Sequence, residues 1–330
     1  MEEHPLLAIV GPTAAGKSGL AIALAKRWNG EIINCDSIQL YRGCDIGSGK
    51  VPLQERHGVP HHLLDVVDPG QPFTAGDFRQ EAERVLQAVR ERKALPIIVG
   101  GTGLYLRALL LGLFEGPQRS EELRARLKSL AERRRRGFLH RMLKRLDSIA
   151  AARIHERDIP KIIRALEVCI LSRQPISALH ERGRIGLQGF RVLKAGLSPD
   201  RQQLALRINR RVEQMFAAGL IDEVRGILSR SDENRIKPLE ALGYRQAGAM
   251  LRGEITLEGA IRATQAATRK YAKRQMTWFR REAEVEWFAG FGDDPAIQQG
   301  VSAWLERKLT ISAPGSHSLA ALETGNGEKP

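Results

Sequence analysis

Short apolar runs alternate with longer amphipathic stretches through the first part of the chain. The runs at 6–10, 31–35, 61–67, 96–99 and 191–197 have the length and branched side chains of buried strands. The stretches 18–26 and 73–93 are helical, and Thr74 or Asp77 is a candidate cap for the second. This order predicts an α/β fold with a parallel sheet, whose ligands bind beyond the carboxyl ends of its strands.

The pattern becomes wholly helical from about residue 115. Leucines recur at helical spacing over 120–130 and again over 139–146, and residues 150–171 continue as a further helix. The run 191–197 then returns to the sheet. We therefore interpret residues 115–188 as a helical insertion in a discontinuous core of residues 1–114 and 189–311.

The remaining chain reads as helices followed by a tail. Residues 200–228 form a long helical segment that Gly219 breaks, and residues 257–281 form a strongly basic helix. Residues 312–330 lack an apolar pattern, so we expect a disordered tail there.

Composition adds one unusual property, a large excess of positive charge. The 330 residues contain 52 Lys and Arg against 38 Asp and Glu, a formal net charge of +14. Such an excess favours a polyanionic partner through counterion release. No apolar run approaches a membrane span, the N-terminus is acidic, and the three cysteines lack metal-type spacing. We expect a cytoplasmic protein, acting as a monomer and without a membrane partner.

The strongest single motif follows the first strand. Gly11-Pro12-Thr13-Ala14-Ala15-Gly16-Lys17-Ser18 fits the P-loop pattern G-x-x-x-x-G-K-[ST] between a strand and a helix. Its backbone amides and the positive helix end form a diphosphate cradle, Lys17 would reach the outer phosphate, and Ser18 would hold Mg²⁺. The motif predicts phosphate binding and a P-loop NTPase-like core, without specifying the phosphate compound.

Two further polar residues follow strands of the same predicted sheet. Asp36 follows the run 31–35, and Thr102 follows the run 96–99. Both therefore fall at the edge that carries the phosphate loop. From the residues alone, a small-molecule kinase is the default interpretation, although a kinase of metabolites has no need of the basic excess.

Several ordered motifs resemble the bacterial tRNA dimethylallyltransferases over roughly residues 6 to 290. They are GPTAAGKS at 11–18, DSIQLY at 36–41, DIGSGK at 45–50, HHLLDVVDP at 61–69, IIVGGTGLYLRALL at 97–110, ARIHERDIPKIIRALEV at 152–168, RINRRVEQMFAAGLIDEV at 207–224, ALGYRQ at 241–246 and TRKYAKRQMTWFRR at 268–281. The departures are mild: Ser48 and Gly49 replace Thr and Ala, and Lys161 stands where Arg is usual.

The resemblance implies transfer of a dimethylallyl group from dimethylallyl diphosphate to N6 of the adenosine next to the anticodon of tRNA. Asp36 would then be the general base, with an Mg²⁺ ligand as its alternative role, and Thr102 would help to position the amine or the diphosphate. Arg211 would be a second phosphate clamp; its alternative is a solvated residue on a long helix.

The resemblance also implies a set of tRNA-binding residues. They are Asp36, Ser37, Ile38, Gln39 and Thr102 around the adenosine, and Arg124, Lys161, Ile162, Ile163, Arg164, Ala241, Leu242, Gly243, Tyr244 and Arg245 around the anticodon loop. Three rivals stay open: a metabolite kinase, a prenyltransferase of free adenine nucleotides, and an RNA-binding module with a vestigial loop.

Overall fold

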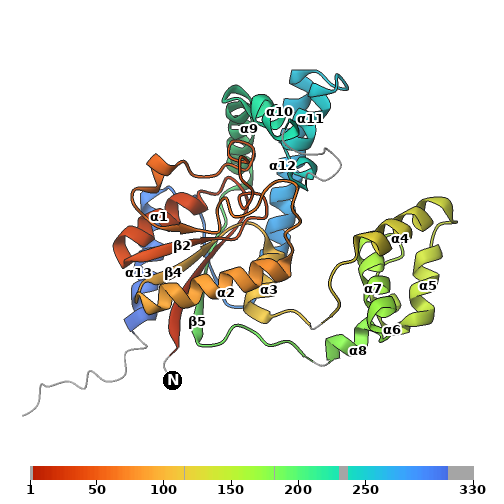
Figure 1. Cartoon of the computed structure of the whole chain (residues 1–330). Coiled ribbons are helices and arrows are strands. Elements are labelled where there is room, and N and C mark those ends of the chain that lie inside the picture. The colour runs from red at the N-terminus through yellow and green to blue at the C-terminus, as the bar shows by residue number, and fades with distance from the viewer. Residues whose placement is uncertain (1–2, 115, 182, 230–236, 311–330) are drawn as a thin grey trace, which may run out of the picture. The chain divides into compact units, whose positions relative to one another are not determined.

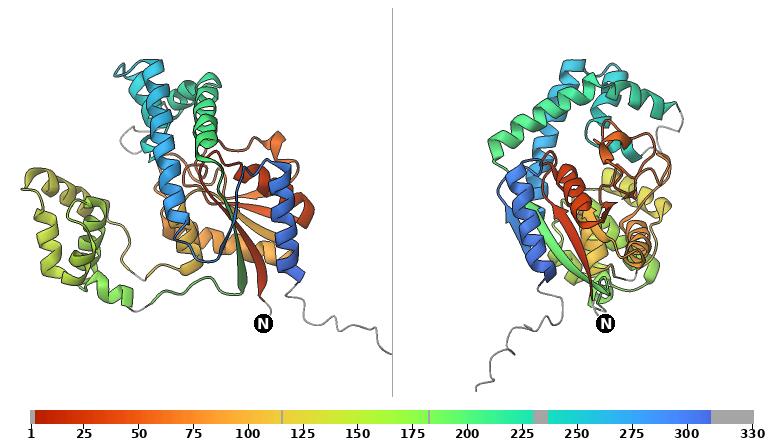
Figure 2. Two further views of the ribbon diagram at one scale, coloured as in Figure 1. Left: turned by 180° about the vertical axis from the view of Figure 1, so that it is seen from behind. Right: turned by 90° about the vertical axis from the view of Figure 1, so that its left-hand side faces the viewer.

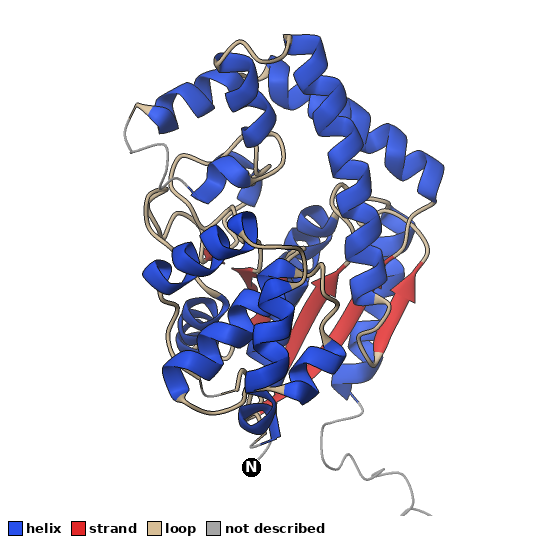
Figure 3. Cartoon of the chain, turned by 90° about the vertical axis from the view of Figure 1, so that its right-hand side faces the viewer, coloured by secondary structure: helices blue, strands red, loops and turns tan. Residues whose placement is uncertain are grey.

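Six parallel strands form one sheet (Figure 1). The structure, a computed structural model, describes residues 3–114, 116–181, 183–229 and 237–310. The strand order is β3-β2-β4-β1-β5-β6, and all pairs are parallel, so the predicted α/β class is confirmed (Figure 3). The strands are β1 (His4–Val10), β2 (Gly30–Asn34), β3 (His61–His62), β4 (Leu95–Val99), β5 (Phe190–Leu197) and β6 (Val285–Phe288).

Helices cover both faces of the sheet (Figure 2). Helix α1 (Lys17–Trp28) and helix α13 (Pro295–Thr310) pack together and share a core with Leu7 and Ile9 of β1. Helix α2 (Ala75–Glu91) contacts β2 and β4. Because side chains alternate along a strand and both faces are covered, the central strands read as continuous apolar runs.

The predicted start of α2 has a complete capping box. The Thr74 side chain accepts a hydrogen bond from the Asp77 amide, and the Asp77 carboxylate accepts one from the Thr74 amide. This reciprocal pair satisfies two amides that a helix start leaves unpaired. Both candidate caps therefore act together.

A helical layer lies beyond the carboxyl ends of the strands (Figure 1). It consists of α9 (Arg201–Ala217), α10 (Leu220–Leu228), α11 (Tyr244–Leu251) and α12 (Leu257–Phe279). Helices α9 and α12 contact each other, as do α10 and α11. The break predicted at Gly219 is confirmed, since Gly219 is the N-cap of α10 with φ 103°. Single 3₁₀ turns are η1 (Leu53–Arg56), between β2 and β3, and η3 (Lys237–Glu240), before α11.

Contacts divide the described chain into two compact units. One contains residues up to Tyr105 and from Gly189 on, and the other is Leu106–Gln188, beginning earlier than the predicted residue 115. The second unit has its own apolar core, built by α4 (Glu121–Arg133), α5 (Phe138–Leu146), α6 (Ser148–Arg153), α7 (Ile159–Ser172) and α8 (Ile176–Glu181). Helix α3 (Gly103–Leu111) crosses the boundary, and the Leu187 amide donates to the Leu110 carbonyl at 3.1 Å.

Two predicted elements differ from the structure. The expected strand 61–67 ends after His62 because Leu63 and Asp65 adopt positive φ values of 58° and 56°. The expected helix 150–171 is two helices, since Asp158 caps α7 and a proline follows in its first turn. Strand β6 and helix α11 were not predicted, and residues 312–330 lie outside the described residues.

In the part of the chain that the structure describes, no helix has both the length and the apolar character needed to cross a membrane.

Candidate active site

The phosphate loop connects β1 to α1 and holds its lysine close to the backbone. Lys17 Nζ donates to the carbonyl oxygens of Gly11 at 3.0 Å and Pro12 at 2.7 Å. Helix α1 begins at Lys17 with Gly16 as its N-cap, so the positive end of the helix faces the loop. The loop thus has the amides, the helix end and the amino group that an anion needs.

Gln275 of α12 ties the phosphate loop to the loop after β4. Its side-chain oxygen accepts from the Thr13 amide at 2.8 Å, and its Nε2 donates to the Gly101 carbonyl at 3.0 Å. A Cβ at Gly101 would lie 2.0 Å from Gln275 Nε2, so only glycine permits this approach. One buried amide therefore sets the spacing of two loops that are far apart in sequence.

Asp36 begins a tight turn after β2. One carboxylate oxygen accepts from the Ile38 amide at 2.9 Å and, more weakly, from the Gln39 amide at 3.4 Å. The Thr102 hydroxyl accepts from the Ser37 amide at 3.1 Å, and the Thr102 amide donates to the Cys35 carbonyl. Thr102 therefore holds the turn that carries Asp36.

Arg211 of α9 reaches this edge from the helical layer. A Cβ at Gly49 would lie 1.7 Å from Arg211 Nη2, so the guanidinium packs directly on the backbone of Gly49. Gln39 Nε2 donates to the carbonyls of Ser48 and Gly49 at 3.2 and 3.4 Å. The segment around Gly49 thus supports both Arg211 and Gln39.

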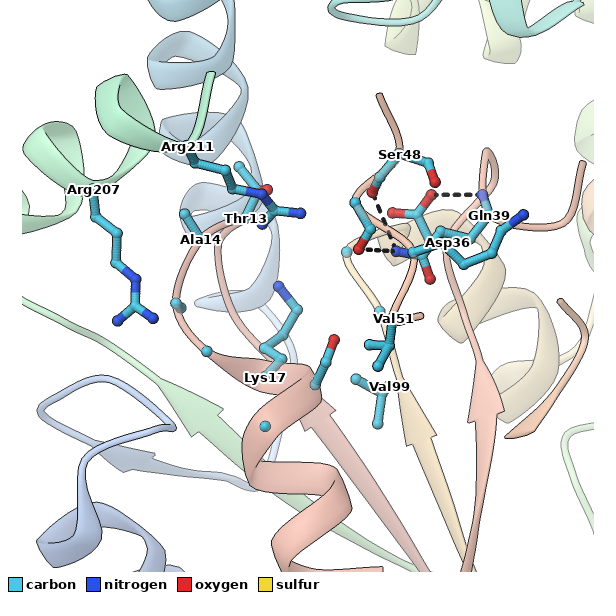
Figure 4. Close-up of a pocket in the computed structure, with 18 of the residues that line it drawn as sticks. Thr13, Ala14, Lys17, Asp36, Gln39, Ser48, Val51, Val99, Arg207 and Arg211 are labelled. Carbon is cyan, nitrogen blue, oxygen red and sulfur yellow. Dashed lines mark hydrogen bonds between the residues drawn. The ribbon is translucent and has the colours of Figure 1, made fainter. Parts of the chain in front are cut away.

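These groups surround a cavity of about 1220 Å³ (Figure 4). The Lys17 amine and the Arg211 guanidinium extend into the space between the phosphate loop and Asp36. The predicted site residues that line the cavity are Thr13, Ala14, Ala15, Gly16, Lys17, Ser18, Asp36, Gln39 and Arg211. Gly11 and Pro12 are not in its lining, and their carbonyls accept hydrogen bonds from Lys17. Ser37, Ile38 and Thr102 are not in its lining, although they shape the Asp36 turn.

Burial and neighbouring charges both shift the pKa values of the two cations of the cavity. Burial lowers the pKa of Lys17 to about 8; Asp36 opposes this effect, and Arg211 adds to it. Burial also lowers the pKa of Arg211, with Asp36 again opposing. The two cations are partly desolvated and have one carboxylate beside them. A bound anion would therefore stabilise their charged forms.

Ser18 is the residue of the loop that fits Mg²⁺. It lines the cavity in the first turn of α1, next to the phosphate cradle. Among the described residues, no group of three or more His, Cys, Asp and Glu gathers as a metal site. The Ser18 hydroxyl is an oxygen ligand of the kind that fits Mg²⁺, which is commonly bound by one or two protein ligands together with substrate phosphates and water.

Two arginines predicted to contact tRNA serve the core of the helical unit. Arg124 Nε and Nη2 donate to the two oxygens of Glu167, each at 2.8 Å, and Arg164 Nη1 donates to Glu167 at 2.7 Å. Glu167 is fully buried. Burial alone would raise the pKa of Glu167, but hydrogen bonds from both arginines outweigh it and lower that pKa to about 2.

Three other predicted tRNA contacts are side chains of the interior. Ile162 and Ile163 lie in the core of the helical unit, and Tyr244 is fully buried with its hydroxyl donating to Glu223 at 2.8 Å. These side chains pack in the interior, and their predicted tRNA contacts stay predictions. Lys161 and Arg245 are exposed, while Ala241 and Leu242 are half-buried and Gly243 is buried before α11.

The chain matches a family model described as IPP transferase over residues 39–282. The chain belongs to the IPP transferase family. Among its curated relatives, the tRNA dimethylallyltransferase of Solibacter usitatus is 53% identical over 295 residues, which are 89% of this chain and 96% of the relative. That of Koribacter versatilis is 53% identical over 298 residues, 90% of this chain and 96% of the relative.

Solved structures of this family share the fold. The tRNA isopentenylpyrophosphate transferase of Bacillus halodurans aligns with a TM-score of 0.68 and 38% identity, covering 94% of this chain and 98% of that one. A eukaryotic dimethylallyltransferase acting on tRNA aligns with a TM-score of 0.76 and 26% identity, covering 93% and 78%. The IPP transferase family is therefore supported by sequence and by architecture.

Some residues of the site were missed at the level of sequence. Gln275, Tyr271 and Arg207 line the cavity, and all three lie inside motifs that carry the family resemblance. In the sequence, the motifs themselves were the signal that could have pointed to these three residues. The individual roles depend on contacts with residues far away in sequence, such as the contact of Gln275 with Thr13.

Proposed function

We propose that this IPP transferase moves a dimethylallyl group from dimethylallyl diphosphate to N6 of the adenosine next to the anticodon of tRNA. The observation that carries the proposal is the cavity in which the phosphate loop, Lys17 and Arg211 face the carboxylate of Asp36. A cation-rich cradle opposite a single carboxylate suits an anionic leaving group on one side and a proton-releasing nucleophile on the other.

The reaction is written as one substitution. The bond between the allylic carbon and the diphosphate oxygen breaks, and its electron pair leaves with diphosphate. The adenosine N6 forms the new bond to that carbon and gives up one proton. Asp36 would orient the amine and accept this proton, since its turn fixes one carboxylate oxygen through the Ile38 amide.

Neutralising the leaving group is the main demand on the protein. The loop amides, Lys17 and Arg211 would stabilise the charge that develops on diphosphate. Ser18 would hold Mg²⁺, which supplies further neutralisation of the phosphates when bound. The phosphate loop then binds a leaving group and does not transfer a phosphoryl group.

The charge of the chain supports RNA as the acceptor. A net charge of +14 exceeds the needs of a free nucleotide and suits an anticodon stem-loop. The names of the curated relatives support the same acceptor. The target base would have to leave its stack to reach the cavity. We further propose that the protein acts as a monomer in the cytoplasm.

The test is transfer of label from dimethylallyl diphosphate to unmodified tRNA, with AMP as the competing acceptor and ATP turnover measured in parallel. We expect label in tRNA, none in AMP and no tRNA-independent ATP hydrolysis. Label in AMP alone would favour the free-nucleotide reading, and ATP turnover alone would favour a kinase.

The matched variant is Asp36→Ala. It should bind tRNA as the wild type does and lose turnover by about 10²–10⁴-fold, the range for a general base. Unchanged turnover would remove Asp36 from the mechanism while leaving the assignment of the substrates intact.

A further inference from the structure

The Glu223 side chain of α10 accepts hydrogen bonds from the backbone amides of residues 45–47. Its Oε2 accepts from the amides of Asp45 at 3.0 Å and Ile46 at 2.7 Å, and its Oε1 accepts from the amide of Gly47 at 3.0 Å. The hydroxyl of the buried Tyr244 also donates to Oε1, at 2.8 Å. One carboxylate thus satisfies four donors, and three of them belong to consecutive residues.

This segment continues directly into two supports of the active site. The Gly49 backbone contacts the Arg211 guanidinium, and the carbonyls of Ser48 and Gly49 accept from Gln39. Gly49 has φ +63° and its amide donates to the Ile46 carbonyl at 3.0 Å. The position of Ile46, fixed by Glu223, therefore sets the position of Gly49.

The other end of the segment is also anchored. Buried Lys50 donates to Asp45 Oδ1 and Asp65 Oδ1, each at 2.6 Å, and to the Tyr41 carbonyl at 3.1 Å. Lys50 joins the segment to the loops that follow β2 and β3, through Tyr41 and Asp65. Glu223 joins the same segment to the helical layer. Arg211 also comes from that layer, so the hydrogen bonds of Glu223 help to position Gly49 relative to Arg211, beside the packing of Tyr244 and Leu220 on Gly47.

We propose that Glu223 is a positioning residue for prenyl transfer, which acts by seating Arg211 and Gln39 through the segment 45–49. It touches neither substrate nor reacting atoms. The inference rests on the proposed diphosphate site, because its effect is transmitted through Arg211. A carboxylate suits the position because each of its oxygens accepts from at least one backbone N–H. An amide at 223 would turn its NH₂ group towards the N–H groups of Asp45 and Ile46 or towards that of Gly47, and a donor cannot bond to a donor.

The experiment is a double-mutant cycle read by the affinity for inorganic diphosphate, measured by calorimetry on the full chain. Glu223→Gln should weaken binding about tenfold, in the range of coupled neighbours. Arg211→Ala should weaken it at least as much. If Glu223 acts through Arg211, the double variant binds no more weakly than Arg211→Ala alone.

Asp222→Asn is the matched control. Asp222 lies on the same turn of α10, is exposed and pairs with Arg225, so its variant should bind diphosphate as the wild type does. A merely structural role of Glu223 would give additive losses in the cycle, and that result overturns the inference. So does wild-type affinity in Glu223→Gln while Arg211→Ala is weakened.

The two proposals fail separately. Normal diphosphate affinity in Arg211→Ala would contradict the proposed diphosphate site itself. If Glu223→Gln does not fold, Glu223→Asp keeps the charge but is too short to hold all three amides. It should show the same loss and the same lack of additivity, and wild-type binding by it overturns the inference.

Discussion

At the scale of single residues, Lys17 has a protonation state that depends on its surroundings. Burial lowers its pKa to about 8 from an ordinary 10.5, while the Gly11 and Pro12 carbonyls hold the amine in place. Between these values the unfolded chain binds more protons than the folded one. The cost of burying Lys17 is thus full below about pH 8 and declines as the pH rises towards 10.5.

We predict that diphosphate recognition falls as Lys17 loses its proton. In the free enzyme kcat/KM for dimethylallyl diphosphate should decline above about pH 8, approaching a tenfold loss for each further pH unit. Lys17→Arg keeps its charge throughout this range, so its profile should lack the decline even if its rate is lower. An identical decline in both proteins would assign the titration to another group.

At the scale of elements, Glu167 joins α7 to the start of α4. It accepts hydrogen bonds from the Ser120 amide at 2.8 Å and from Arg124 of α4. Arg164, which lies on α7 with Glu167, donates a further one. The folded pKa of about 2 lies below the ordinary 4.5, so its stabilisation is present above about 4.5. That stabilisation is lost as the pH falls towards 2.

We predict that Arg124→Ala destabilises the helical unit by about 3 kcal/mol, because it leaves a buried carboxylate short of a partner. Hydrogen exchange of the α7 amides measures this change, and it should be largest near neutral pH. Arg126→Ala is the control, since Arg126 is exposed on the same helix. Equal protection in the two variants would show that Arg124 does not support the core.

The sequence was most informative where one physical signal dominated. Strands buried on both faces appear as apolar runs, and the P-loop pattern singled out Lys17 and Ser18, which line the cavity. It was least informative where distant contacts decide. Arg124 is one arginine among many in a basic chain, and only its position opposite buried Glu167 distinguishes a core residue from a surface one. Strand β6 is short and half-exposed, so its pattern is weak.

At the scale of the whole molecule, the positive charge is unevenly distributed. Residues 112–185 contain 18 Lys and Arg against 9 Asp and Glu, hence +9 of the +14 of the chain. Among the described residues, the apolar core of this unit contains none from the sheet unit. The sheet therefore folds around a core in one part of the chain, whereas most of the net positive charge lies in another.

We predict that the two properties can be separated by excision. Replacing residues 112–185 with a short Gly-Ser linker is feasible because Leu110 and Leu187 are hydrogen-bonded neighbours. The shortened protein should retain a cooperative thermal transition and diphosphate binding within about threefold of wild type. Its tRNA affinity should fall by at least about a hundredfold, with a shallower dependence on salt. Retention of tRNA affinity would place the main RNA contacts on the sheet unit.

Gln275 makes the phosphate loop less portable than its eight-residue motif implies. The Thr13 amide and the Gly101 carbonyl are joined by a side chain more than 170 positions away from either loop. A graft of residues 11–18 onto another scaffold would carry the consensus letters without this brace. In engineered recombinants, the P-loop, the glycines after β4 and Gln275 therefore need to be transferred together, because they contact one another in the folded protein.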